Sequence, residues 1–342
     1  MKYRNKIILF TAVLLYIAAN SGCKKIIKVT TTINRNGSFL RTVEVIQKDS
    51  TSVPHAAFPI PQDSTWNITI NRVHEDSGDF IYRAEKIFKN ADELNSFFCS
   101  ETDTVLKTKV EVDFEKRFRW FYTFFEYHET YKCYNQFKLV PITDYMTEQE
   151  LEAYQAHEDS SELKEKFEEW FQRAIFEEFY QVLIDGAKRL KAPDFTPELI
   201  ESKKEILYTQ VIKAMDSDKD EMKDLIELAE KILNSSVVVK LESDLEKMEK
   251  SVTTRIEFYS AVNDDSLITV VNMPGLLVDT NAPKIEGNQV TWNIAPGRYF
   301  IRDFEATAVS RVTNKWAIGI TIGICILLFG GLALTNIRSK NA

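Results

Sequence analysis

Residues 28–45 read KVTTTINRNGSFLRTVEV. Polar and apolar side chains alternate on both sides of Asn36-Gly37, ending at Val43 and Val45. A period of two places successive side chains on opposite faces of a strand, and Asn-Gly favours the tight turn that joins two antiparallel strands. The stretch therefore predicts a β-hairpin. One face of its first strand carries Ile27, Val29, Thr31 and Ile33.

The same period recurs on both sides of a long central region. Residues 68–73 and 80–88 predict a second hairpin, and Asn90 with Glu93 has the spacing of a capping box for a short helix ending near Phe98. Further strands are expected at 110–114, 256–262, 267–272, 290–294 and 300–308. We expect the face of Val110, Val112 and Phe114 to continue through Phe118, Trp120, Tyr122 and Phe124.

The central region, from Thr147 to about Lys250, has the apolar spacing of helices. One stripe contains Phe167, Phe171, Ala174, Phe179, Val182 and Leu190, and a second contains Phe176, Tyr180 and Ile184. A helix that is apolar on two sides needs cover on two sides, which the stretches 199–214 and 225–233 can supply. Thr196-Pro197 predicts an N-cap and a first-turn proline for the former. We predict a helical bundle whose aromatic stripes form its core.

These patterns predict an α+β protein: an antiparallel, sandwich-like β domain with a long inserted α-helical bundle and a C-terminal transmembrane helix. Because the β segments flank the insertion, we expect them to form one sheet system whose terminal strands lie side by side at the same membrane surface. The expected segments are a lipoprotein signal peptide (1–22), the first β-rich part of an exterior domain (23–143), the acidic helical insertion (144–250), the second β-rich part (251–314), the transmembrane helix (315–337) and a cytoplasmic tail (338–342).

The N-terminal residues predict export. Lys2, Arg4 and Lys6 precede an uncharged apolar run over 7–19, as in a secretory signal peptide. The following Ser21-Gly22-Cys23 looks like a bacterial lipobox, in which Cys23 is acylated, although Asn20 stands where an aliphatic residue is usual. The alternatives are an ordinary signal peptide with a chance cysteine, or an uncleaved anchor.

The C-terminal residues predict membrane anchoring. No charged residue occurs over 316–337, between Lys315 and Arg338. About 20 apolar residues suffice for a helix to cross a hydrocarbon core about 30 Å thick. A single acyl chain binds a membrane only marginally, whereas a spanning helix is held effectively permanently. We therefore expect the bacterial inner membrane, with the exterior domain on the periplasmic or extracytoplasmic side.

Four cysteines occur in the chain. Cys23 is the candidate acylation site and Cys325 lies in the expected transmembrane helix, so two remain in the exterior domain. Cys99 and Cys133 form a pair that an oxidising compartment could join as a disulfide. The alternative is two free buried cysteines.

The strand and turn residues carry a resemblance to a known family. They are residues 28–45, Met273-Pro274-Gly275, Thr280-Asn281-Ala282, Gly287-Asn288 and Val290-Thr291-Trp292. Together they resemble the LppM-like family of mycobacterial membrane-tethered lipoproteins, which also pairs a lipobox with a C-terminal span. The resemblance covers roughly the β-rich ends and implies an α+β envelope domain with affinity for lipid and no catalytic residues. The long helical insertion departs from the family pattern.

Composition and motifs argue against several function classes. With 43 Lys and Arg against 51 Asp and Glu, the 342-residue chain lacks the basic balance of a nucleic-acid binder. The four histidines show no zinc-site spacing, and neither a nucleophile elbow nor a phosphate-binding glycine loop occurs. The pair His128-Glu129 is interpreted as a surface pair on a strand. We expect no cofactor and no enzymatic activity.

One stretch has a weak likeness to a calcium-binding loop. The acidic residues match five ligand positions of an EF-hand, but the glycine position is Glu221, and Lys223 adds a positive charge. The alternative is a helix linker whose acids cap and complement the next helix. The candidate ligands are Asp216, Asp218, Asp220, Asp224 and Glu227.

The charge is unevenly distributed. Residues 144–250 hold 28 acidic and 15 basic residues, so the insertion carries the negative charge of the chain. Basic residues near the two expected anchors would be attracted to anionic headgroups. They are Lys24, Lys25, Lys28, Arg311 and Lys315. We therefore expect the β domain to lie on the membrane and the acidic bundle to project toward a basic protein partner.

The leading functional hypothesis is a non-enzymatic interaction or scaffold module at the inner membrane. The first alternative is a lipid-binding module that holds an acyl chain between the sheet and the short helix at 91–98, motivated by the aromatic residues at 118–125. The second is a hydrolase. Nothing in the sequence identifies the partner.

Overall fold

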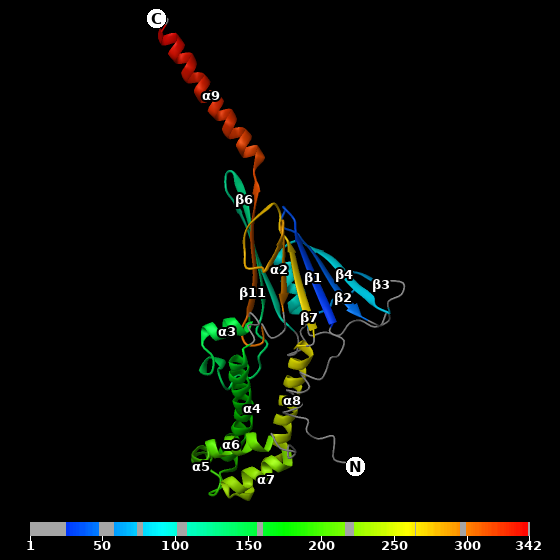
Figure 1. The fold of residues 1–342 in the computed structure, drawn as a ribbon, viewed down its shortest axis with the longest axis vertical. Helices are drawn as coiled ribbons and strands as arrows, with labels where there is room; N and C mark the ends of the chain where they lie inside the picture. Colours follow the sequence, from blue (N-terminus) through cyan, green and yellow to red (C-terminus); the bar gives the residue numbers. More distant parts are fainter. Residues whose placement is uncertain are drawn as a thin grey trace.

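The computed structural model describes residues 25–47, 58–73, 78–100, 108–155, 160–215, 222–263, 265–294 and 299–340. Figure 1 shows two β-sheets in the middle of the molecule, a helical arm at one end and a long single helix at the other. The mixed α+β fold predicted from sequence is confirmed, with sheets that are mainly antiparallel.

The larger sheet has seven strands in the order β3-β4-β2-β1-β7-β10-β9. The predicted first hairpin is confirmed, because β1 and β2 pair in antiparallel register with Ile33 opposite Phe39. One pairing departs from the antiparallel expectation: β1 runs parallel to β7, with Lys25 opposite Asp265. The strands are β1 (Lys25–Ile33), β2 (Phe39–Gln47), β3 (Asn67–Arg72), β4 (Phe80–Phe88), β7 (Asp265–Asn272), β9 (Lys284–Glu286) and β10 (Gln289–Ile294).

The smaller sheet has four strands in the order β5-β6-β11-β8. They are β5 (Val110–Phe118), β6 (Tyr122–Tyr131), β8 (Leu276–Thr280) and β11 (Phe304–Thr313). β1 and β11 therefore lie in different sheets, so the expectation that the terminal strands lie side by side is wrong. The alternating pattern of a strand does not show which other strands it pairs with. In the structure, β1 pairs with β7, and β11 pairs with β6 and β8.

The expected face of the β5–β6 hairpin is also corrected. Val112 of β5 is buried opposite Glu129 of β6, so the inner face of β6 continues through the odd-numbered Tyr127 and Phe125. Tyr122 and Phe124 lie on the opposite face. Aromatic residues occupy both faces of this strand, and the turn between the strands shifts the alternation by one residue.

A polar network joins the two sheets inside the apolar core. Arg41 of β2 and Glu129 of β6 are both fully buried, and Arg41 Nη2 donates to Glu129 Oε1 at 2.6 Å. The Tyr127 and Tyr131 hydroxyls donate to Glu129 at 2.8 and 3.1 Å. Arg41 Nη1 also donates to Thr31 Oγ1 at 2.6 Å. The interpretation of Glu129 as a surface residue is therefore wrong, because it occupies an inward position of the strand.

The pKa values of this network follow from its burial and its charges. Burial raises the pKa of the Tyr127 and Tyr131 hydroxyls above the usual range for tyrosine, and the charge of Glu129 adds to this. Burial alone would lower the pKa of Arg41, but the carboxylate of Glu129 outweighs it and the pKa is raised. Both tyrosines are therefore held as hydrogen-bond donors toward a carboxylate that faces a permanent cation.

The short helix α2 (Ala91–Ser100) begins as predicted. The Asn90 side chain accepts from the Glu93 amide at 2.9 Å, and the Glu93 side chain accepts from the Lys89 amide at 2.7 Å. Asn95 exchanges two hydrogen bonds of 2.8 Å with the backbone of Val112, which fixes α2 against β5.

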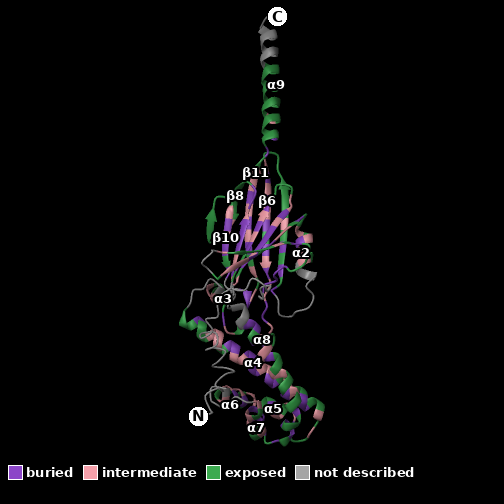
Figure 2. Cartoon of the chain, turned by 90° about the vertical axis from the view of Figure 1, so that its right-hand side faces the viewer, coloured by how far each residue is buried: buried purple, intermediate pink, exposed green. Residues whose placement is uncertain are grey.

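The helical arm is built from two long helices that leave the sheets and a group of shorter helices at the far end (Figures 1 and 2). The long helices are α4 (Ser161–Leu190) and α8 (Glu242–Asn263). The shorter helices at the far end are α5 (Pro197–Ser202), α6 (Lys204–Met215), α7 (Met222–Leu233) and η2 (Ser236–Leu241). Two more precede α4, namely η1 (Ile142–Asp144) and α3 (Glu148–Gln155), and α3 lies near the sheets (Figure 1). Thr196 caps α5 as predicted, since its Oγ1 accepts from the Leu199 amide at 3.3 Å.

α4 contributes to two cores at different positions along its length. Trp170 and Phe171 belong to the core that continues into the sheets. Phe176 and Phe179 belong to a second core within the bundle. α8 likewise contributes Leu245 to the bundle core. Because α4 and α8 each contribute to both cores, they join the bundle to the sheets through continuous packing.

The strand expected at 256–262 is wrong, because this segment is the last part of α8. Val252, Ile256 and Tyr259 are buried at spacings of four and three residues, which is the stripe of a helix. Ile256 and Phe258 are both buried and stand two residues apart, which produced the strand-like pattern. The helical segment therefore extends to Asn263, and the β structure resumes at Asp265.

The last helix, α9 (Lys315–Lys340), follows β11 directly and points away from the arm (Figure 1). Among the described helices it is the one with the length and apolar composition needed to cross a membrane. Its described side chains are mostly exposed, as Figure 2 shows. At about 1.5 Å per residue, it is long enough for a hydrocarbon core of about 30 Å.

Candidate membrane-proximal site

The junction of β11 and α9 is held by a single buried side chain. Asn314 accepts a hydrogen bond from Thr123 Oγ1 at 3.0 Å. Its Nδ2 donates to the carbonyl oxygens of Arg119 at 2.8 Å and Trp120 at 3.2 Å, and its backbone amide donates to the Phe121 carbonyl at 2.8 Å. Asn314 therefore fastens the turn between β5 and β6 to the start of α9.

Four aromatic side chains surround this junction. Phe118 stacks on Trp316 with ring centroids 6.1 Å apart, and Trp120 meets the same ring edge-on at 5.5 Å. Trp120 Nε1 also donates to Thr321 Oγ1 of α9 at 2.8 Å. Phe121 is the fourth, and all four are about half exposed. Aromatic rings with a polar edge are typical of the membrane–water interface.

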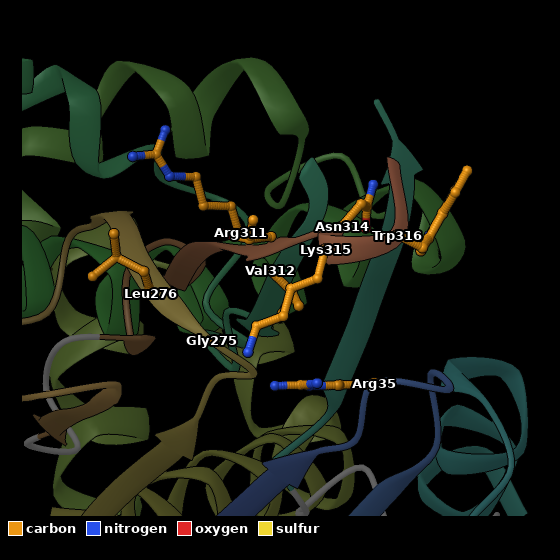
Figure 3. Close-up of a pocket in the computed structure, with 9 residues that line it drawn as sticks. Arg35, Gly275, Leu276, Arg311, Val312, Asn314, Lys315 and Trp316 are labelled. Atoms are coloured by element: carbon orange, nitrogen blue, oxygen red, sulfur yellow. The ribbon is translucent and has the colours of Figure 1, made fainter. Parts of the chain in front are cut away.

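A cavity of about 570 Å³ opens beside this aromatic group. It lies where the β1–β2 turn and the β7–β8 connection meet the end of β11 and the first residues of α9 (Figure 3). The lining contains basic, polar and apolar residues and no acidic one. It consists of Arg35, Gly275, Leu276, Arg311, Val312, Thr313, Asn314, Lys315 and Trp316.

Arg35 is presented by a tightly bonded turn. The Gly37 amide donates to the Asn34 carbonyl at 2.9 Å, and the Ser38 amide donates to Asn36 Oδ1 at 3.0 Å. Lys116 Nζ of β5 donates to the Arg35 carbonyl at 2.8 Å, which ties the turn of the larger sheet to the smaller one. The exposed Arg35 side chain therefore extends from an ordered backbone.

Gly275 brings the opposite wall of the cavity close to β11. Its φ is +84°, a conformation that favours glycine, and a Cβ at this position would lie 2.4 Å from the Arg311 carbonyl oxygen. The adjacent Pro274 carbonyl accepts from Ser310 Oγ at 2.9 Å. The close approach therefore depends on the absence of a side chain.

The cations of the cavity have different surroundings. The Arg311 guanidinium lies over the Tyr122 ring at 4.8 Å and points away from the other two in Figure 3. Lys315 and Arg35 point toward one another across the cavity (Figure 3). Within the described ranges, neither of them forms an ion pair with an acidic residue.

The structure separates the basic residues that the sequence grouped together. Arg311 and Lys315 lie at the base of α9 as expected. Lys28 lies on β1 and faces Glu44 with an N–O distance of 3.9 Å. β1 begins beside the first residue of β7, which follows α8, so Lys25 stands at the arm end of the sheet. Lys24 and the candidate acylation site Cys23 lie outside the described residues.

The remaining candidates are placed only in part. The thiol of Cys133 donates to the Phe300 carbonyl at 3.0 Å, and burial raises its pKa. The Cys99 side chain lies outside the described part, so the disulfide stays a prediction. Asp224 and Glu227 lie on α7, whereas Asp216, Asp218 and Asp220 are not described, so the calcium loop also stays a prediction. No group of metal-binding side chains occurs among the described residues.

Sequence reasoning missed Arg35 and Asn314 as members of this site. The Asn36-Gly37 pair predicts a tight turn but does not show which distant segment that turn approaches. Arg35 and Lys315 are 280 positions apart in the chain. The aromatic residues at 118–125 motivate the alternative of a lipid-binding module. In the structure, Phe118 and Trp120 contact Trp316 of α9, and Phe125 is part of the core. The acyl-chain site beside α2 stays a prediction.

Replacing Asn314 with alanine is expected to release the β5–β6 turn from α9, because three side-chain hydrogen bonds are lost. At roughly 1 kcal/mol for each net hydrogen bond, amide exchange over residues 118–123 should rise by about tenfold or more. Hydrogen-exchange mass spectrometry of the full chain in detergent measures this. Asn314→Asp keeps the acceptor for Thr123 but loses both Nδ2 donations, so it should give most of the rise seen in Asn314→Ala. An unchanged exchange rate in Asn314→Asp would contradict the role given to Nδ2.

Comparison with known proteins adds one loose likeness. No family model matches the chain, and no curated protein matches it. Among solved structures, the NMR structure of the folded domain of Mycobacterium tuberculosis LppM matches with 10% identity, over 85% of this chain and 91% of that chain, with a TM-score of 0.31. A superposition this loose carries no argument about the site or its chemistry, and the LppM-like family therefore remains a resemblance.

Proposed function

We propose that this protein is a non-enzymatic, membrane-anchored envelope module that holds an acidic helical bundle away from the membrane for a basic protein partner. α9 supplies the anchor, the two sheets form the body, and the arm carries the interaction surface. In this proposal the anchor lies in the inner membrane, with the body and arm on its extracytoplasmic side. Acylation of Cys23 is a second, separate anchor that the proposal does not require.

The observation that carries this proposal is the placement of α9 and the arm at opposite ends of the sheets (Figure 1). The strands are about 30 Å long at roughly 3.3 Å per residue, and α4 adds about 45 Å in its own direction. Surface charges several tens of ångströms from a membrane are screened from its headgroups, because the Debye length is about 8 Å in physiological salt. The acidic surface of the bundle is therefore available to a soluble or neighbouring protein.

Exposed acids at the far end of the arm support a partner of opposite charge. Four of them form neither an ion pair nor a side-chain hydrogen bond among the described residues, and they lie on three different helices. Electrostatic complementarity of this kind chiefly speeds association and selects partners. The four are Glu198 of α5, Glu227 of α7, and Glu242 and Glu246 of α8.

Replacing these four acids with glutamine is expected to weaken the native complexes of the membrane-embedded protein. Raised salt concentration should weaken the complexes of the wild-type protein in the same way. The measurement is native gel electrophoresis of detergent-extracted complexes, followed by mass identification of the components. The partner should carry a basic surface. The control neutralises four exposed acids of the sheets to the corresponding amides, namely Asp113, Glu115, Glu286 and Glu305. Unchanged complexes in the arm variant, or equal loss in the control, would contradict the proposal.

A further inference from the structure

We propose that the cavity at the base of α9 binds the phosphate of an anionic phospholipid from the membrane that α9 crosses, with Arg35 and Lys315 as its cationic ligands. The inference rests on the membrane anchoring by α9 in the proposed function, but not on the acidic arm. It also places lipid at a different position from an acyl chain held beside α2.

Two like charges converge on the cavity. Arg35 and Lys315 come from the β1–β2 turn and from the first residue of α9, and in Figure 3 they point into the same space. Two cations that share a cavity without an acidic lining residue repel each other. An anion between them removes this repulsion and accepts charge-assisted hydrogen bonds from both. A guanidinium and an ammonium are the side chains best suited to phosphate oxygens.

An ordered frame surrounds the cavity. The turn that carries Arg35 is held by its own hydrogen bonds and by Lys116. Lys315 is fixed by the junction at Asn314, and the opposite wall by the close approach of Gly275 to β11. A frame that is ordered before the ligand arrives lowers the entropy cost of binding. The volume of about 570 Å³ is in the range of small-molecule sites and accommodates a phosphate with its glycerol.

The surroundings of the cavity favour an anion that is part of a lipid. The cavity opens at the first turn of a helix whose exposed side chains are apolar, at the level of the aromatic side chains that mark a membrane interface. Leu276, which lines the cavity, is 61% exposed, and Trp316 is 54% exposed. A lipid whose phosphate lies between the two cations can place its acyl chains along these residues and α9. A soluble phosphate would leave both of them in contact with water.

The experiment uses the full chain, purified in detergent and freed of lipid. Native mass spectrometry with equal amounts of phosphatidylglycerol and phosphatidylcholine should show preferential retention of one phosphatidylglycerol. The double variant Arg35→Gln/Lys315→Gln should reduce that retention by about tenfold or more, because two charge-assisted hydrogen bonds are lost. Inorganic phosphate at millimolar concentration should displace the lipid only weakly.

The matched control is Arg119→Gln. Arg119 is an exposed cation of the same membrane-proximal end, but it does not line the cavity. Because Arg119 does not line the cavity, its loss should change retention by less than about twofold. Equal losses in Arg119→Gln and in the double variant would overturn the site. Equal retention of both lipids, or full displacement by inorganic phosphate, would overturn the assignment to an anionic lipid. None of these results bears on the test of the arm.

Discussion

Replacing Glu129 with glutamine is expected to lower the free energy of unfolding by about 3–5 kcal/mol, because the fully buried guanidinium of Arg41 then faces a neutral amide. The side chain keeps its size and place between the two sheets, so little packing is lost. Arginine cannot escape the cost by losing its proton. The measurement is chemical denaturation of the full chain in detergent, followed by tryptophan fluorescence.

The reciprocal variant, Arg41→Met, should cost less than Glu129→Gln. The hydroxyls of Tyr127 and Tyr131 still donate to the Glu129 carboxylate when Arg41 is removed, whereas Glu129→Gln leaves the buried Arg41 guanidinium facing a neutral amide. The double variant Arg41→Met/Glu129→Met should be more stable than the sum of single losses predicts, because it removes both charges from the core.

The control for this pair is Glu44→Gln. Glu44 lies on the outer side of β2 and pairs with Arg83 at 3.1 Å, where both side chains are partly exposed. Such pairs contribute about 1 kcal/mol or less. If Glu129→Gln and Glu44→Gln cost the same, the buried network does not contribute to stability in the way argued.

Replacing Gly275 with alanine is expected to lower the free energy of unfolding by about 3 kcal/mol or more. Two effects add: the residue must keep φ at +84°, and its new Cβ would lie 2.4 Å from the Arg311 carbonyl oxygen. That oxygen belongs to the backbone of β11, so relief requires β8 and β11 to separate. The same separation should open the cavity and reduce lipid retention there. Thermal and chemical denaturation measure the stability loss.

Gly287→Ala separates the two effects. Gly287 also has a positive φ, +67°, but no atom outside its immediate neighbours lies within 4 Å of a Cβ built there. This variant should lose only the conformational cost, about 1–2 kcal/mol. Equal losses at the two glycines would show that the close approach to β11 does not matter.

Much of the local structure could be predicted from short stretches. The hairpin at Asn36-Gly37, the capping box at Asn90 and the N-cap at Thr196 each depend on interactions within a few residues. The segment 256–262 failed because a short apolar pattern fits a strand and a helix alike, and the packing of α8 against α4 decided between them.

Only the part of the candidate site at the start of α9 could be predicted from the sequence. Arg311 and Lys315 stand beside an uncharged segment, so their place at the base of α9 follows from their position in the chain. Arg35 reaches the same place because β1 runs parallel to β7 and ends near the β7–β8 connection. No local pattern encodes such a pairing, since the two strands are separated by more than 230 residues.

The amino-acid sequence alone determined the periods of the strands and helices, their caps, the acidic character of the insertion and the apolar helix at the C-terminus. Each of these depends on residues that are close in the chain. Only the tertiary structure decided which face of β6 is buried, that Glu129 meets Arg41, and that Arg35 and Lys315 share a cavity. The physical reason is that buried faces and shared cavities arise from packing between segments that are distant in the chain. Aromatic and charged residues on both faces of a strand leave the local pattern ambiguous, so it does not show which face will be buried.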